Sequence, residues 1–278
     1  MSIINAVILG FVQGVAEFLP ISSSGHLSIL NNLFHMSSVE EGHLFFDVLL
    51  HFGTLVSICV VYWQDIVDMV HEVLGIVNLG PLAGERRERY PSARVFYMIV
   101  MATLPLLIVL PIQDMLETLY YNNIFIGITL VLTGCMLFVC DKMTVGRKTG
   151  NTMTTLDAII IGLCQCVAIV PGLSRSGTTI TAGVACGLKK EFAVKFSFLM
   201  SLPAVLGANI LSFIDVIKSG GIDWHSVPAY LVGTAVAMVS GIAALSFLKH
   251  VVSKGKFGGF AYYCWLVGVL SIILTMIF

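Results

Sequence analysis

Two short stretches of this chain carry side chains that could perform acid–base chemistry and bind an anion. The first stretch, residues 13–26, is polar within an apolar sequence, and its chemically active side chains are Gln13, Glu17, Ser23 and His26. A carboxylate, a hydroxyl and an imidazole at this spacing could activate a nucleophile or attack a substrate directly. The second stretch, residues 165–178, contributes Arg175, whose planar guanidinium suits a phosphate or a carboxylate.

The two stretches are copies of each other. A shift of 152 residues aligns Gly10, Gln13, Ala16, Ser22, Ser24 and Gly25 with Gly162, Gln165, Ala168, Ser174, Ser176 and Gly177. The same shift sets Glu17 against Ile169, Ser23 against Arg175 and His26 against Thr178. One copy therefore carries the acid, the base and a hydroxyl, and the other carries the cation. Two such loops in corresponding halves of a membrane protein usually mark a central site.

Arg175 is the sharpest single signal, because an arginine inside a membrane is costly and generally functional. The same tip adds hydroxyl and backbone N–H donors for an anion, from Ser174, Ser176, Gly177 and Thr178. The alternative is that Arg175 forms an ion pair with Glu17 that only holds the two tips together.

The first tip would supply the groups that react. Gln13 lies four positions before Glu17 on the same helical face, so the pair could bind a divalent cation. Glu17 could instead orient His26 or activate a nucleophile, or it could be a buried hydrogen-bond anchor. His26 could be a general acid, a general base or a nucleophile, or an ordinary buried histidine. The other substrate-binding candidates of this tip, which could also cap the following helix, are Ser22, Ser24 and Gly25.

Composition places these residues in an integral membrane protein. The chain is 57% hydrophobic and 11% charged, whereas soluble domains carry about 25% charged residues. Its net charge of −1 gives no reason to expect a nucleic-acid partner. The seven cysteines lie mostly in apolar runs without a CxxC pair, so we interpret them as small core residues. The first residues lack the basic region of a signal peptide.

Six segments are long and apolar enough to span a membrane as helices, near residues 45–63, 95–112, 122–140, 192–214, 227–248 and 259–278. Two further apolar regions, 2–35 and 155–187, are each interrupted by the polar motifs. We predict an all-α polytopic membrane protein with two repeats, 1–141 and 155–278, joined by a polar linker. Each repeat holds one broken region and three spans. Asp47 and His51, at the start of the first span, could face the same pocket or lie at the membrane–water interface.

The distribution of positive charge decides how the broken regions enter the membrane. If both are re-entrant hairpins, twelve lysines and arginines fall on one side and only Lys218 on the other. The positive-inside rule favours this arrangement and places both termini outside. With three spans in each half, the repeats are inverted, so the hairpins enter from opposite faces and meet near the middle. Irregular backbone at that depth must line a polar cavity or be buried in protein.

The motif Gln13-x-x-x-Glu17 with the following Phe-Leu-Pro-Ile-Ser-Ser-Ser-Gly-His26, and the motif Pro171-Gly-Leu-Ser-Arg-Ser-Gly177, resemble the signatures of a known family. It is the bacterial undecaprenyl-pyrophosphate phosphatase, or bacitracin-resistance, family, and the resemblance covers essentially the whole chain. It implies removal of the terminal phosphate of undecaprenyl pyrophosphate, which recycles the lipid carrier for cell-wall synthesis. It also implies a bacterial cytoplasmic membrane location, a site open to the periplasm, and a divalent cation such as Mg or Ca.

Carried over residue by residue, the resemblance marks Glu17, Ser23, His26 and Arg175 as catalytic. Gln13 stands where the family has either Glu or Gln, so this chain lacks one anionic ligand for a metal. The reading from the residues fits this chemistry, since a pyrophosphate needs cationic donors on one side and a nucleophile with a proton acceptor on the other. We favour Ser23 as the nucleophile, with His26 and water as alternatives.

The main competing function is a polyprenyl-phosphate transporter or flippase, because inverted repeats with broken helices are transporter architecture. A carrier would need an anion site but not a clustered acid, base and hydroxyl, so we expect an enzyme. The polyprenyl tail would lie among membrane lipids between the spans while the headgroup reaches the cavity. The sequence does not indicate an oligomeric state.

Overall fold

The computed structural model describes residues 1–34, 44–77, 91–109, 111, 116, 118–144, 146–219, 223–254 and 257–277. Within these ranges the regular structure is helical, and the only β contact is an isolated bridge between Lys148 and Leu188. In chain order the helices are α1 (Ile3–Phe18), α2 (Ser23–Phe34), α3 (Leu44–Val61), α4 (Trp63–Ile76), α5 (Pro91–Thr103), η2 (Leu104–Ile108), η4 (Thr118–Tyr121), α7 (Asn123–Lys142), α8 (Thr155–Val167), α9 (Arg175–Ala185), α10 (Lys190–Ser219), α11 (Val227–Ser253) and α12 (Gly258–Ile277). The predicted all-α class is confirmed.

The predicted spans are present as long apolar helices. Five segments are long and apolar enough to cross a membrane, namely α5 with η2, α7, α10, α11 and α12. The remaining predicted span corresponds to α3, which α4 continues after a bend of 78°. Large apolar side chains such as Leu231, Val239 and Leu266 are exposed on the outer faces of these helices, as contact with lipid requires. The chain is therefore a multi-pass membrane protein.

Helix α4 was not predicted from the sequence. It is amphipathic, and its acidic side chains make specific contacts with neighbouring helices. The Glu72 carboxylate accepts hydrogen bonds from the backbone N–H groups of Ser92 and Ala93, at 2.6 and 2.8 Å, and so caps the N-terminus of α5. Asp65 forms an ion pair with Lys195 of α10. The bend after α3 therefore places α4 where it fixes two of the spans.

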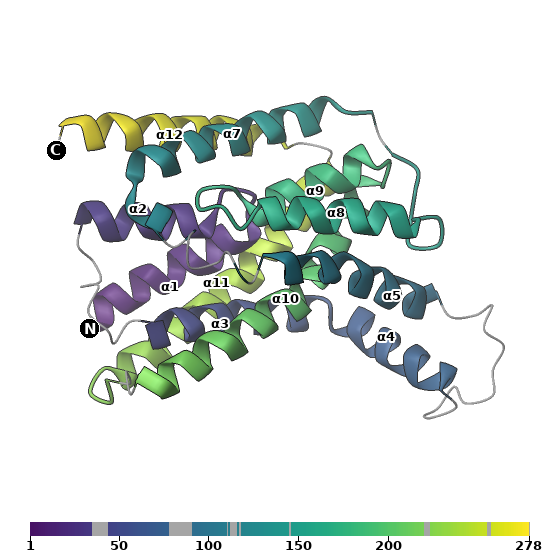
Figure 1. The fold of residues 1–278 in the computed structure, drawn as a ribbon, viewed down its shortest axis with the longest axis horizontal. Coiled ribbons are helices and arrows are strands. Elements are labelled where there is room, and N and C mark those ends of the chain that lie inside the picture. The colour runs from purple at the N-terminus through teal and green to yellow at the C-terminus, as the bar shows by residue number, and fades with distance from the viewer. Residues whose placement is uncertain are drawn as a thin grey trace.

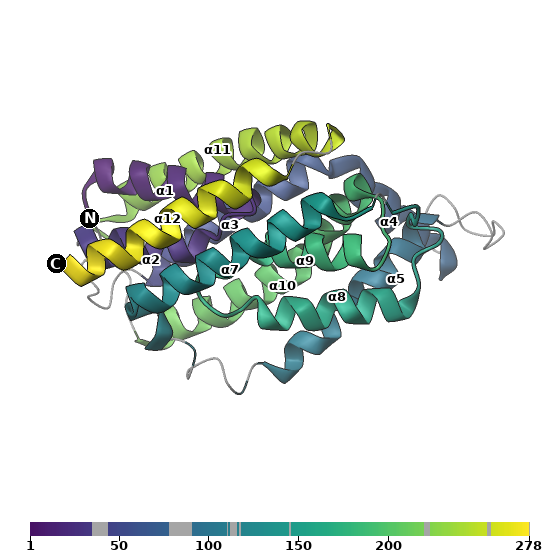
Figure 2. The same ribbon diagram turned by 90° about the horizontal axis from the view of Figure 1, so that it is seen from above.

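The two broken regions form helical hairpins at opposite ends of the molecule. Figures 1 and 2 show α1 and α2 in the half that holds both chain termini, and α8 and α9 in the other half. The first helices of the two hairpins, α1 and α8, begin at Ile3 and Thr155. These positions are 152 residues apart, which is the shift of the sequence repeat. The two connecting turns face each other in the middle. How deeply each hairpin enters a bilayer stays a prediction.

Repeated glycines explain part of the sequence similarity outside the motifs. A Cβ atom added at Gly10 of α1 would collide with the Gly233 carbonyl of α11. The residue that aligns with it, Gly162 of α8, meets the Ala102 carbonyl of α5 in the same way. Each hairpin therefore packs closely against the second span of the opposite half, and the contacts of α1 with α11 and of α8 with α5 are counterparts.

The segment between the two halves is fixed to the start of α8. The Lys148 ammonium forms an ion pair with the Asp157 carboxylate at 2.8 Å. Asp157 and Thr154 form a capping box at the N-terminus of α8. Arg94 of α5 donates a hydrogen bond to the Met153 carbonyl at 2.8 Å. Several basic residues used in the topology prediction lie outside the described residues, namely Arg86, Arg87, Arg89 and Lys256.

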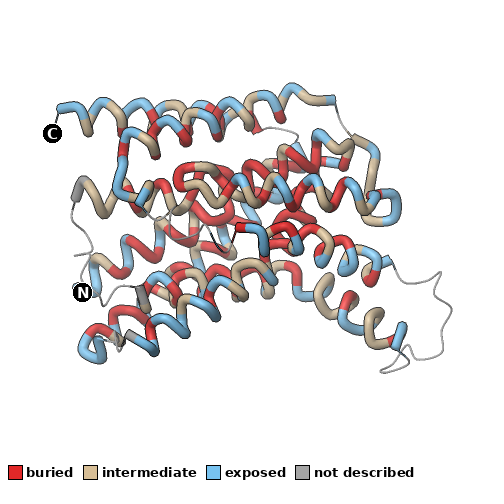
Figure 3. Tube along the Cα trace, in the orientation of Figure 1, coloured by how far each residue is buried: buried red, intermediate tan, exposed pale blue. Residues whose placement is uncertain are grey.

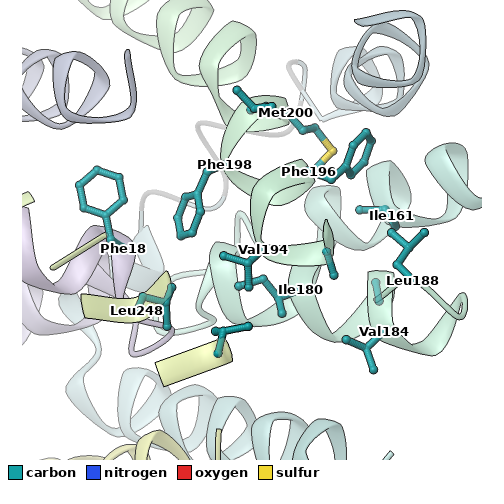
Figure 4. Packing of buried hydrophobic residues seen from close by; sticks show 14 of the residues in the cluster. Phe18, Ile161, Ile180, Val184, Leu188, Val194, Phe196, Phe198, Met200 and Leu248 are labelled. Carbon is teal, nitrogen blue, oxygen red and sulfur yellow. The ribbon is translucent and has the colours of Figure 1, made fainter. Parts of the chain in front are cut away.

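The buried residues gather where the hairpin turns meet, as Figure 3 shows. Behind the turns lies an apolar core in which Phe18 of α1 faces Phe198 of α10, with ring centroids 5.6 Å apart (Figure 4). Ile180 of α9 and Val194 of α10 belong to the same core. Close packing of this kind stiffens both turns, because a displaced side chain would leave a cavity.

Candidate active site

The first turn places Ser23 at the start of α2. Ser22, just before it, has a φ of 71°, and it is the only non-glycine residue with positive φ in the described ranges. The Ser22 hydroxyl accepts a hydrogen bond from the Gly25 backbone N–H at 3.2 Å and so caps α2. A left-handed backbone is strained for a serine. This cap offsets the strain. The left-handed conformation of Ser22 turns the chain so that Ser23 lies close to α1.

The second turn repeats this construction and places Arg175 at the start of α9. Ser174 caps the helix by accepting a hydrogen bond from the Gly177 N–H at 3.1 Å. The turn needs Gly172, whose φ is 85° and whose added Cβ would collide with Thr129 of α7. Ser23 and Arg175, aligned by the repeat, therefore each follow a serine that caps a helix. The two turns differ in backbone, since φ is 71° at Ser22 and −75° at Ser174.

Glu17 joins the two turns. One carboxylate oxygen, Oε1, forms an ion pair with the Arg175 guanidinium through Nη2. The other, Oε2, accepts a hydrogen bond from the Ser23 hydroxyl at 2.6 Å and a second one from the Gln13 amide at 3.2 Å. Glu17 is buried in the protein. The carboxylate is thus paired with a cation and accepts the serine hydrogen bond on its other oxygen, which is the geometry of a general base with its nucleophile.

His51 extends this network on the side of α3. Its Nδ1 lies 3.1 Å from the Gln13 Nε2. The amide nitrogen can only donate, so Nδ1 is the acceptor and a neutral ring carries its proton on Nε2. Asp47 and His51 both line the cavity described next. Asp47 is at the same time exposed, so it reaches the pocket without being shut off from its surroundings.

A cavity of about 780 Å³ lies where the two turns meet. The predicted site residues that line it are Glu17, Ser22, Ser23, Ser24, Ser174, Arg175 and Ser176. One wall is largely apolar and comes from η2 and α10, with Leu106, Leu107, Pro203, Val205, Ile210 and Leu211. The cavity therefore joins a polar end, suited to an anion, to an apolar wall suited to a hydrocarbon chain.

Five predicted site residues are not among the described residues that line the cavity, namely Gln13, Gly25, His26, Gly177 and Thr178. Gln13 is fully buried behind Glu17, and Gly25 and Gly177 use their N–H groups in the helix caps. The Gly177 amide, expected to bind the anion, is thus occupied by Ser174. Thr178 is buried on α9, and its hydroxyl has no hydrogen-bond partner in the described structure.

His26 faces α12. Its Nδ1 lies 2.7 Å from the Ser22 carbonyl oxygen, which can only accept, so Nδ1 carries a proton and donates it. Its Nε2 then accepts a hydrogen bond from the Tyr263 hydroxyl at 2.9 Å, and the two rings stack with centroids 5.6 Å apart. Both ring nitrogens of a neutral His26 are therefore occupied within the protein. The imidazole holds the strained backbone of Ser22 in place.

The protein donors do not form a metal site by themselves. No group of three His, Cys, Asp or Glu side chains that could hold a metal occurs in the part of the chain that the structure describes. The Glu17 carboxylate already accepts from three protein donors, and one of them is the Arg175 cation. The Gln13 Oε1 atom is buried without a partner, but one neutral amide oxygen is a weak ligand. The polar end is therefore built for an anion.

Two residues of the site, Gln165 and Tyr263, were not predicted from the sequence. Gln165 lines the cavity from α8, and the only signal for it was its alignment with Gln13. Tyr263 lies 237 residues from His26 in the sequence, and no pattern could have paired them.

Comparison with known proteins places the chain among membrane phosphatases. The family model described as "Bacitracin resistance protein BacA" matches residues 6–270. A protein of Methanosphaera stadtmanae named undecaprenyl-diphosphatase is 36% identical over 100% of this chain and 99% of its own length. One of Alkaliphilus metalliredigens with the same name is 38% identical over the full length of both chains. Undecaprenyl-diphosphatase 4 of Bacillus cereus is 36% identical over 100% of this chain and 98% of its own.

Proposed function

The chain belongs to the BacA family of bacitracin resistance proteins, and we propose that it hydrolyses undecaprenyl diphosphate in the cavity where its two hairpin turns meet. The products are undecaprenyl phosphate, which is the reusable lipid carrier of cell-wall synthesis, and inorganic phosphate. The match to relatives named undecaprenyl-diphosphatase over the whole chain supports a phosphatase rather than a transporter. The site also contains a hydroxyl hydrogen-bonded to a carboxylate, Ser23 with Glu17, which a carrier of lipid phosphates would not need.

The observation that carries this proposal is the contact between Ser23 and Glu17. The Ser23 hydroxyl donates to Glu17 Oε2 at 2.6 Å, while Arg175 contacts the other oxygen of the same carboxylate. In our mechanism Glu17 takes the hydroxyl proton as Ser23 Oγ attacks the terminal phosphorus. The bond from that phosphorus to the bridging oxygen breaks, and undecaprenyl phosphate leaves with the bridging oxygen.

The phosphoserine formed in this step is hydrolysed by water. Glu17 first passes its proton to the departing lipid phosphate. It then takes a proton from the attacking water and returns it to Ser23 Oγ as inorganic phosphate is released. Arg175 is placed to stabilise the charge on the transferred group in both steps. His26 acts as a positioning residue, because its ring nitrogens bind Ser22 and Tyr263.

The apolar wall would hold the first part of the polyprenyl chain. Leu106 and Leu107 of η2 and Leu211 of α10 are among the residues of this wall. The rest of the chain would lie among membrane lipids. Glu17 and Gln13 alone would hold Mg²⁺ or Ca²⁺ only weakly, because they offer one paired carboxylate and one neutral amide.

We also propose that the protein lies in the cytoplasmic membrane with both termini outside and the site open to that side. Repeats 1–141 and 155–278 would then be inserted in opposite orientations within one membrane domain. The cavity extends from the two turns along α10, whose residues from Pro203 to Ser212 line it. It therefore runs toward the C-terminal end of α10, which lies on the side of the two chain termini. That direction is the periplasmic one if the basic segment near Lys148 is cytoplasmic.

The test is release of inorganic phosphate from farnesyl diphosphate by the purified protein in detergent. Ser23→Ala and Glu17→Gln should each lower kcat by at least about 1,000-fold, as expected for a nucleophile and its base. Ser246→Ala, which removes an exposed hydroxyl on α11, is the matched control and should leave kcat unchanged. Activity of Ser23→Ala close to that of the control would overturn the serine mechanism and leave His26 or water as the attacking group.

A further inference from the structure

Gln165 is a buried polar side chain at the cavity that has no role in the mechanism above. Gln165 of α8 is 2% exposed, and in the described structure neither its Nε2 nor its Oε1 has a hydrogen-bond partner. Both atoms belong to a residue that lines the cavity. A buried amide normally finds partners, because leaving it unpaired costs free energy. An unpaired amide at the wall of a ligand cavity therefore suggests that the ligand is the partner.

A second unpartnered donor borders the same cavity. Arg175 uses Nη2 for Glu17, whereas its Nη1 is buried without a hydrogen-bond partner. Gln165 and Arg175 lie on the two helices of one hairpin, before and after its turn. One hairpin therefore presents an amide and a guanidinium arm that are both unsatisfied in the described structure. Side-chain donors of this kind match the non-bridging oxygens of a phosphate.

The two glutamines that the repeat aligns, Gln13 and Gln165, differ in their hydrogen-bond partners. Gln13 of α1 is the counterpart of Gln165, and its Nε2 is occupied by Glu17 and His51. The residue that aligns with Glu17 in the second repeat is Ile169, which cannot accept a hydrogen bond, and the Gln165 amide has no partner among the described residues. The first glutamine thus orients the base, and the second is left available for a ligand.

We propose that Gln165 is a substrate-positioning residue whose Nε2 donates a hydrogen bond to a non-bridging oxygen of the diphosphate, beside the Nη1 arm of Arg175. This inference rests on the proposed function and adds to it a residue that selects for a phosphate headgroup. A carboxylate at this position would repel the substrate and compete for Arg175. The neutral amide is therefore part of the specificity of the site.

The test compares Gln165→Met and Gln165→Glu with the same changes at Gln64, an exposed residue of α4 that hydrogen-bonds to Asp68. Losing one hydrogen bond to a charged group should raise KM for farnesyl diphosphate about 10- to 100-fold in Gln165→Met. The value of kcat should change by less than about threefold, because Ser23 and Glu17 remain. Gln165→Glu should raise KM further, and both Gln64 variants should keep the wild-type KM.

Binding of a non-hydrolysable analogue, farnesyl methylenediphosphonate, separates this inference from the serine mechanism. Its Kd should rise by the same factor as KM in Gln165→Met, while the melting temperature stays equal or increases because an unpaired amide has been removed from the interior. An unchanged Kd would overturn the inference, as would a lower melting temperature with unchanged KM, which would indicate a structural role. An active Ser23→Ala protein would overturn the serine mechanism and leave the Kd result valid.

Discussion

At the scale of single residues, the chemistry of the site depends on which polar atoms already have a hydrogen-bond or ion-pair partner within the protein. Glu17 Oε2 accepts a hydrogen bond from the Ser23 hydroxyl, and Oε1 forms an ion pair with Arg175. His26 has the right type for catalysis, but its ring nitrogens bind Ser22 and Tyr263. His26 therefore differs from Ser23 and Glu17 in that its hydrogen bonds run to Ser22 and Tyr263 and not to the Glu17 carboxylate.

The position of His26 predicts how its variants behave. His26→Asn keeps a donor near the Ser22 carbonyl and should retain about tenfold more activity than His26→Ala. Tyr263→Phe removes the partner of Nε2 and should lower kcat about fivefold, together with a small decrease in melting temperature. Steady-state kinetics and thermal unfolding of the three variants measure these effects. If His26 were the nucleophile, its two variants would be equally inactive.

The occupied carboxylate predicts how the protein responds to divalent cations. Because Glu17 is paired with Arg175 and Gln13 is neutral, Mg²⁺ should leave the melting temperature of the substrate-free protein unchanged. Gln13→Glu adds a second carboxylate beside Glu17 and should give a melting temperature that rises with Mg²⁺ and falls with EDTA. A clear Mg²⁺-dependent stabilisation of the wild-type protein without substrate would contradict our description of the polar end.

At the scale of elements, two hairpins are held against two spans by closely packed glycines. Gly10 and Gly162 sit at equivalent crossings, against Gly233 and Ala102. The turns that follow are shaped by Ser22 and by Gly172, which both have positive φ. The reacting groups are therefore positioned by backbone contacts some distance from the cavity.

This packing predicts that Gly162→Ala destabilises the protein. In an ordinary helix interior, Gly→Ala is stabilising by about 0.5–1 kcal/mol. Here the new methyl group would overlap the Ala102 carbonyl and force α8 away from α5, at a cost of about 1–3 kcal/mol. Gly259→Ala is the matched control, since an added Cβ there meets nothing within 4 Å. Thermal unfolding in detergent should show a lower melting temperature for the first variant alone; equal melting temperatures would contradict the close crossing.

At the scale of the whole molecule, apolar length and the internal repeat were enough to predict the spans and the meeting of the two motifs. They were not enough for α4, because its Asp65, Asp68 and Glu72 resemble a polar loop when the bend after α3 is unknown. The sequence also could not predict which polar atoms of the site form hydrogen bonds within the protein. That the Gly177 amide is occupied and that Gln165 is not depends on contacts that only the folded chain makes.

The orientation can be tested with single cysteines in a background without the seven native ones. Trp224 is highly exposed before α11, near the end of the molecule that holds the termini, and Thr152 is exposed in the segment before α8. Trp224→Cys should react with a membrane-impermeant maleimide in intact cells, and Thr152→Cys should react only after permeabilisation. The opposite labelling pattern would reverse the orientation and the side from which substrate enters.

The most direct test of the whole account is to trap the intermediate on the enzyme. Farnesyl diphosphate labelled in its terminal phosphate is mixed with the protein, the reaction is quenched within milliseconds in a neutral denaturant, which preserves phosphoserine and the acid-labile phosphohistidine alike, and the labelled peptide is mapped by mass spectrometry at neutral pH. We predict a phosphate ester on Ser23, which forms in the wild-type protein and is absent from Glu17→Gln. A phosphorylated His26 would contradict the assignment of nucleophile and base on which the mechanism rests.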